Sequence, residues 1–128
     1  MNKTTPKSIT GNEDWLDSRD IQERLEWLES FDDEDLTDEE KEEYNELYRF
    51  RDYMIEHYDK DSWFWGFLFI RDEYFTEYAE EFANEIGAID DKQYWLTKHI
   101  DWDAVARDMQ DDYWEVDFFG NTYWTRVQ

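Results

Sequence analysis

The excess of acidic residues is the feature that most limits how this chain can fold. Its 128 residues include 36 Asp and Glu but only 13 Lys and Arg, so the formal net charge at pH 7 is −23. Such charge, with a mean hydropathy of −1.09, is typical of disordered chains, because few apolar groups offset the entropy lost on ordering. Aromatic residues argue against disorder, since they make up 20% of the chain and each can bury roughly 150 to 250 Å². The sequence therefore predicts a folded aromatic core inside a negative shell.

The first half of the chain predicts two antiparallel helices. Apolar residues recur at helical spacing in residues 18–31, which gives one apolar face. A second helix is expected from Thr37, which has capping-box spacing with Glu40, to about residue 58. A short acidic loop joins the two, so we expect a helical hairpin over residues 14–60, preceded by a flexible tail over residues 1–13.

The second half predicts a small domain of mixed helices and strands over residues 61–128. Its expected elements are a buried strand over Trp63–Ile70, a helix from Asp72 to Ile86, a helix from Asp101 to about Gln110, and a β-hairpin with Gly120 and Asn121 between its strands. We expect this hairpin to pair with the strand near residue 68. The predicted fold class is α+β, with the helical hairpin attached to a helix-plus-antiparallel-sheet domain that ends in a β-hairpin.

The sequence gives little support for catalysis or for a cofactor. The chain has no cysteine, which removes disulfides, thiolate catalysis and cysteine zinc sites and fits a cytoplasmic protein. Pairs such as Asp101 with Asp103 arise by chance among 36 acids, and the acidic stretch after Asp32 lacks the glycine of a calcium loop. His57 and His99 are the only histidines and are far apart in the sequence. We therefore expect no enzyme, no cofactor and no metal site.

The charge also limits the partners that this protein can bind. Phosphate backbones and anionic lipids repel a strongly negative surface, so we expect no direct binding to nucleic acid or to a membrane. The longest apolar run, Trp63–Ile70, is also too short to span a bilayer. The expected partner is instead a basic protein.

The acids are concentrated in the predicted helical hairpin. Residues 13–43 contain sixteen acids and three bases, which gives this segment a net charge of −13. Like-charged neighbours on a helix cost about 0.2 to 0.5 kcal/mol per pair, and solubility needs a net charge of only about 2 to 8. Adaptation to high salt selects acids, but it does not obviously select 26 aromatic residues. We therefore predict that these carboxylates imitate DNA phosphates and bind the DNA-binding groove of a basic host protein.

The predicted partner-binding acids lie in three parts of the chain. They are Asp20, Glu23, Glu26, Glu29, Asp32, Asp33, Glu34, Asp35, Asp38, Glu39, Glu42, Glu43, Asp90, Asp91, Asp111 and Asp112. Four aromatic residues near the C-terminal hairpin, Tyr113, Phe119, Tyr123 and Trp124, are too many to face one small core. Either the helices pack on only one face of this hairpin, or these residues form the interface of a homodimer.

The second half of the chain resembles a known family. The segments Glu77-Tyr78-Ala79 to Ile86-Gly87, Ile100-Asp101-Trp102 to Met109, and the final Tyr123-Trp124-Thr125-Arg126 resemble the last domain of ArdA-type antirestriction proteins. The opening Asp14-Trp15-Leu16-Asp17-Ser18-Arg19 is similar to small phage and plasmid relatives of that family. This resemblance implies an acidic protein from a mobile element that mimics bent DNA, often as a dimer, and occupies the DNA site of type I restriction-modification enzymes. It implies no catalytic residues.

We accordingly expect an antirestriction DNA mimic that acts in the cytoplasm of a bacterial host. Two alternatives remain open at this point. One is a DNA mimic with another target, such as a CRISPR effector, a repair glycosylase or a nucleoid protein. The other is an acidic adaptor that binds its partner through exposed aromatic residues.

Overall fold

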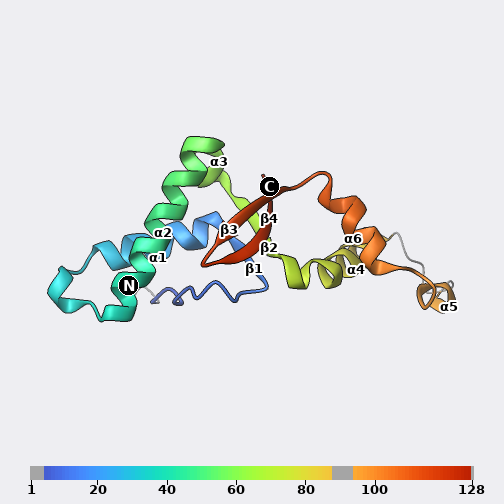
Figure 1. The fold of residues 1–128 in the computed structure, drawn as a ribbon, viewed down its shortest axis with the longest axis horizontal. Helices are drawn as coiled ribbons and strands as arrows, with labels where there is room; N and C mark the ends of the chain where they lie inside the picture. Colours follow the sequence, from blue (N-terminus) through green and yellow to red (C-terminus); the bar gives the residue numbers. More distant parts are fainter. Residues whose placement is uncertain (1–4, 88–93, 128) are drawn as a thin grey trace.

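A four-stranded antiparallel sheet lies in the middle of the computed structural model, which describes residues 5–87 and 94–127 (Figure 1). The elements along the chain are β1 (Trp15–Asp17), α1 (Ser18–Glu29), the 3-10 helix η1 (Asp33–Asp35), α2 (Asp38–His57), α3 (Lys60–Trp65), β2 (Phe67–Arg71), the 3-10 helix η2 (Asp72–Tyr74), α4 (Phe75–Glu85), α5 (Tyr94–Thr97), α6 (Trp102–Gln110), β3 (Trp114–Phe118) and β4 (Asn121–Val127). The strand order is β1-β2-β4-β3, so β4 is central although it comes last in the chain. The α+β fold and the final β-hairpin confirm the prediction from the sequence.

Helices cover both faces of this sheet. Successive side chains of a strand point to opposite faces, and Phe67 and Phe69 of β2 pack with α1, α2 and α3, whereas Ile70 packs with α4 and α6. Figure 1 shows this arrangement along the long axis of the molecule, with the α1–α2 hairpin on one side of the sheet and α4 and α6 on the other. The sheet thus has a separate hydrophobic core on each face.

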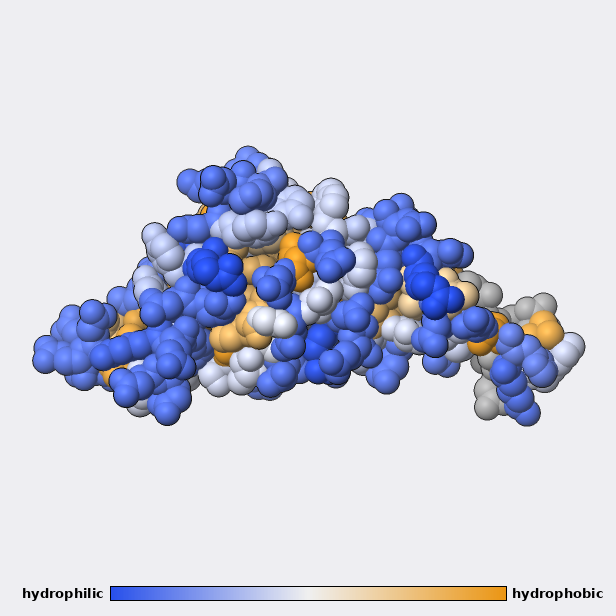
Figure 2. All heavy atoms as spheres, in the orientation of Figure 1, coloured by the Kyte–Doolittle hydropathy of each residue, from blue (hydrophilic) through white to orange (hydrophobic). Residues whose placement is uncertain are grey.

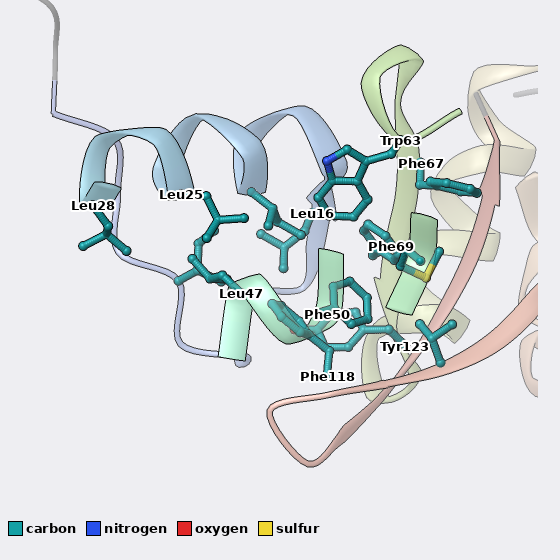
Figure 3. Close-up of a cluster of buried hydrophobic side chains, with 14 residues drawn as sticks. Leu16, Leu25, Leu28, Leu47, Phe50, Trp63, Phe67, Phe69, Phe118 and Tyr123 are labelled. Carbon is teal, nitrogen blue, oxygen red and sulfur yellow. The ribbon is translucent and has the colours of Figure 1, made fainter. Parts of the chain in front are cut away.

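The larger core is built from aromatic rings, as the sequence predicts. Phe50 of α2 lies at its centre, with ring centroids 4.3 Å from Phe118, 5.1 Å from Phe69 and 6.3 Å from Trp63. Figure 3 shows these rings packed together between the helices and the sheet. Such ring pairs contribute about 0.5 to 1.5 kcal/mol each beyond their buried area, so the core gives the negative surface a rigid support.

The smaller core holds α4 and α6 against the other face of the sheet. Phe75 contacts Tyr113 edge-on at 5.1 Å and lies 6.3 Å from Trp124. Ala79 of α4 and Ala106 of α6 are buried in the same cluster. Their small side chains allow the two helices to approach closely.

Side chains cap the first turns of α1, α2 and α6. Asp17 accepts the backbone N–H of Arg19 at the start of α1, and Asp101 accepts that of Ala104 at the start of α6. Thr37 and Glu40 form the predicted capping box of α2. Local chemistry at these positions therefore sets the helix boundaries.

Two local predictions were wrong. The run Trp63–Ile70 is not one strand, because its first three residues complete α3 and Gly66, with a φ of 131°, separates that helix from β2. The hairpin turn is formed by Phe119 and Gly120, both with positive φ, whereas Asn121 already pairs with Phe118. The turn is therefore displaced by one residue from the predicted Gly120-Asn121.

Residues 9–13 also differ from the predicted flexible tail over residues 1–13. Ile9 is buried in the larger core, and its N–H donates to Glu43 at 2.9 Å. The carbonyl of Gly11 accepts hydrogen bonds from the Tyr123 hydroxyl at 2.9 Å and from the side chain of Asn121. Contacts distant in sequence fix this segment, and no local pattern encodes them.

The same core joins the two predicted domains. Its members come from α1 and α2 as well as from β2, β3 and β4, and β1 pairs with β2 across the predicted boundary at residue 60. The described parts of residues 14–60 and 61–128 consequently pack as one unit.

Candidate partner-binding surface

Most of the predicted partner-binding acids lie on the surface. The structure exposes Asp20, Glu23, Glu26, Glu29, Asp32, Asp33, Glu34, Asp35, Asp38, Glu39, Glu42, Asp111 and Asp112. The densest group is the tip of the α1–α2 hairpin, residues 29–42, which contains nine acids and one lysine. The capping box at Thr37 and the 3-10 helix η1 fix the backbone of this tip, so the carboxylates project from ordered structure.

These exposed acids have few basic neighbours. Among the residues that the structure describes, Glu29 is the only one of the thirteen in an ion pair, at 3.9 Å from Arg51. Burial raises the pKa of Asp20, and the nearby carboxylates of Asp17 and Glu23 raise it further. Like charges thus lie close together at the start of α1, although Arg19 pairs with Asp17 at 2.7 Å and offsets part of this repulsion.

Glu43 is the exception among the predicted acids, and assigning it to the partner-binding set was wrong. Its side chain is 9% exposed and accepts two hydrogen bonds from Arg24, at 2.8 and 2.9 Å. Arg24 also donates to the carbonyl of Pro6 and lies over the ring of Trp27. Glu43 therefore holds α2, α1 and the N-terminal segment together and presents no charge to a partner.

Two further predicted acids, Asp90 and Asp91, lie outside the described residues.

A second acidic surface, on η2 and α4, was missed in the sequence analysis. Asp72, Glu73, Glu77, Glu80, Glu81 and Glu85 are all exposed, and residues 72–85 contain no Lys or Arg. The helix carries its buried residues on the opposite face. A count of bases as well as acids along this helix would have found the surface.

The predicted dimer contacts are largely inside the protein. Tyr123 is fully buried and Tyr113 is 9% exposed, while Phe119 and Trp124 are half-buried. Burial raises the pKa of both tyrosines. Helices on both faces of the sheet account for all four rings, so the two alternatives in the sequence analysis, one covered face or a dimer, were incomplete.

Other aromatic side chains occupy the surface instead. Trp65, Trp15 and Trp114 are 69%, 57% and 48% exposed, respectively. They do not form part of the acidic hairpin tip. Large exposed indoles are common at protein interfaces.

The described residues contain no group of three acidic or histidine side chains arranged to hold a metal ion. His57 instead contacts the carbonyl of Tyr53 through Nδ1 at 3.0 Å. None of the helices in the described part of the chain has the length and apolar character needed to cross a membrane.

Comparisons of this protein with models of known protein families, with curated proteins and with solved structures find no match. The surface therefore has to be interpreted from its own geometry and charge.

Proposed function

We propose that this protein is a DNA mimic that occupies the DNA-binding site of a bacterial defence nuclease, with type I restriction-modification enzymes as the first target. The observation that carries the proposal is the set of thirteen exposed carboxylates on a rigid aromatic core, of which only Glu29 is in an ion pair within the described part of the chain. The protein would act in the cytoplasm, without a catalytic step, by excluding DNA from its target.

The positions of several acids support a role outside folding. Carboxylates near the C-terminal end of a helix interact unfavourably with its dipole, by about 0.3 to 1 kcal/mol each. Glu29 ends α1, Glu85 ends α4, and Asp111 and Asp112 follow α6. These acids do not stabilise the helices on which they lie, which favours selection for binding.

The amount of charge fits a short duplex. DNA carries about one negative charge per 1.7 Å of axis, so 23 charges correspond to roughly 40 Å, or about a dozen base pairs. The 20-residue helix α2 is by itself about 30 Å long. A surface of this size can pair with several Lys and Arg residues of a DNA-binding groove at once.

Rigidity supports the same proposal. A disordered acidic segment loses conformational entropy when it binds, which lowers its affinity. The hairpin tip is ordered by its caps, and Leu25, Leu28 and Leu47 anchor it in the larger core. The carboxylates are therefore held in place before a partner arrives.

Displacement of DNA from a purified type I enzyme tests the proposal. The protein should compete with a fluorescent duplex for the enzyme, and its affinity should fall steeply between about 0.05 and 0.3 M salt, because many ion pairs form together. Failure to displace the duplex, or an affinity that does not change with salt, would contradict the proposal. Plating of unmodified phage on hosts with and without type I restriction provides the cellular counterpart.

Two matched variants locate the surface. One carries Glu23→Lys, Glu26→Lys, Asp33→Lys and Glu42→Lys on the helical hairpin, and the other carries Glu77→Lys, Glu80→Lys, Glu85→Lys and Asp108→Lys on the opposite side of the sheet. Both change the net charge equally at exposed positions. The first should abolish displacement and the second should weaken it less. Equal losses would show that total charge, and not the hairpin, determines binding.

A further inference from the structure

Strand β3 is an open edge of the sheet. It pairs only with β4, through Trp114–Thr125, Glu115–Trp124, Val116–Tyr123, Asp117–Thr122 and Phe118–Asn121. In a two-residue hairpin the pair next to the turn exchanges both backbone hydrogen bonds, and every second pair does the same. The peptide groups of Glu115 and Asp117 consequently point away from β4, and they have no hydrogen-bond partner among the described residues.

An open groove runs beside this edge. It has a volume of about 580 Å³ and is lined by Arg49 and Tyr53 of α2, by Glu115, Val116 and Asp117 of β3, and by Thr122. Figure 2 shows a hydrophobic patch in the middle of the molecule, over the hairpin, with hydrophilic residues around it. The edge is therefore accessible to another chain.

Contacts between α2 and the hairpin bound the groove at both ends. At the turn, the N–H of Phe119 donates to Glu46 at 3.0 Å. At the other end, the ring of Tyr58 lies 5.1 Å from that of Trp114. Between these contacts the free peptide groups have the two-residue spacing that an added strand requires.

We propose that this edge binds an extended segment of a partner protein as a fifth strand, antiparallel to β3, with Lys or Arg at alternate positions. The side chains of Glu115 and Asp117 lie on one face of the sheet, and residues directly opposite them on an added strand would lie on that same face. A basic side chain at each of these positions forms a cross-strand ion pair. The basic character of the partner rests on the function proposed above.

The groove also has space for the residue of the added strand that lies between its two basic residues. Alternate side chains of an added strand point to the other face, where Val116 and the half-exposed ring of Tyr53 lie. Tyr53 is held by stacking on His57, with ring centroids 4.1 Å apart. The charge of Arg49 is compensated by Glu46 at 2.6 Å. An apolar residue of the added strand therefore fits beside Val116 and Tyr53.

A second copy of this chain fits the edge poorly. If two β3 strands pair antiparallel about Val116, Glu115 of each copy lies opposite Asp117 of the other. Like charges directly opposite one another destabilise a sheet. The same carboxylates that disfavour self-association therefore favour a basic strand.

Binding of a short peptide tests the proposal without a nuclease. The probe is a blocked pentapeptide of alternating lysine and valine, Lys-Val-Lys-Val-Lys, added to the full chain labelled with ¹⁵N. At saturation, exchange of the Glu115 and Asp117 amide protons should slow by roughly tenfold or more, because they gain hydrogen bonds. The amide of Val116 already donates to β4 and should change less.

Two methylated peptides provide the control. A backbone N-methyl group on the central lysine removes an N–H that faces β3, whereas one on a neighbouring valine removes an N–H that faces away. Only the valine-methylated peptide should still bind at the edge. Equal binding of both peptides, shifts spread evenly over all acidic helices, or protection of these amides in the free protein by self-association would overturn the proposal.

Paired charge reversals separate the edge from general electrostatics. Glu115→Lys with Asp117→Lys should weaken peptide binding at least tenfold more than Glu80→Lys with Glu85→Lys, which changes the net charge equally on α4. Equal effects would overturn the assignment. If the peptide binds at the edge but the protein fails to displace DNA, the proposed function falls and the edge site stands. If displacement succeeds and the peptide does not bind at the edge, only this inference falls.

Discussion

Glu42 and Glu43 are adjacent in the sequence but have opposite environments, so one substitution at each separates a structural acid from a surface acid. Glu43 is buried and accepts hydrogen bonds from Arg24 and from the N–H of Ile9, whereas Glu42 is exposed and has no ion pair among the described residues. The variants Glu43→Gln and Glu42→Gln remove the same charge. They should differ in the free energy of unfolding and in partner binding.

The magnitude follows from the burial of the pair. Breaking a buried ion pair leaves an uncompensated charge and costs about 3 to 5 kcal/mol. With an unfolding entropy of about 2.1 cal/mol/K per residue, a loss of this size in a chain of 128 residues lowers Tm by about 11 to 19 °C. Glu42→Gln should change stability by less than about 0.5 kcal/mol, with a slight gain because Asp38 and Glu39 lose a like-charged neighbour.

Urea unfolding and thermal melts measure the difference in stability between the two variants. The DNA-displacement assay measures the difference in partner binding. Glu43→Gln should retain displacement below its melting temperature, whereas Glu42→Gln should weaken it slightly. The double variant Arg24→Met with Glu43→Leu should recover part of the lost stability, because neither charge is then left alone, although the buried N–H of Ile9 still loses its acceptor. Equal stability of the two single variants would refute the assignment of Glu43 to the interior.

Three further predictions concern other parts of the molecule. Raising salt from about 0.05 to 0.5 M should raise Tm, because screening weakens repulsion among exposed acids; a lower Tm would contradict this. Gly87→Ala should cost roughly 1 to 2 kcal/mol, because this glycine has a positive φ. Gly11 also has a positive φ, but there the new Cβ would in addition lie 2.3 Å from Phe119, so Gly11→Ala should destabilise the protein more. Equal losses in urea unfolding would count against this contact. The hydrogen bond to Glu81 raises the pKa of Tyr74 to about 12. The stabilising effect of this bond is therefore present below the unfolded pKa of about 10 and is lost as the pH rises through about 12. Absorbance at 295 nm should show that Tyr74 ionises at lower pH in Glu81→Gln and at an unchanged pH in Glu80→Gln.

Local sequence signals predicted the helices well, because their determinants lie within one turn. The Thr37 capping box and the helix expected from Asp101 are examples. The turn at Phe119 was misplaced because Glu46, 73 residues away, accepts the N–H of this residue. Contacts of this kind leave no local pattern.

The candidate surface was predicted unevenly for the same reason. Charge density identified the hairpin tip, because exposed acids need no particular partner. It could not distinguish Glu43 from Glu42, since only the tertiary position of Arg24 separates them. It also could not show that helices cover both faces of the sheet, so that Tyr123 is buried.

The central position of β4 has a consequence for folding. This strand pairs with β2 more than 50 residues earlier, and its Tyr123 reaches Gly11, 112 residues away. Contacts so distant in sequence slow folding, typically to milliseconds or seconds. Until β4 pairs with it, one edge of β2 is open, and such unpaired edges are prone to aggregate. A net charge of −23 keeps partly folded chains apart, so the acids that we assign to partner binding also protect the protein while its sheet assembles.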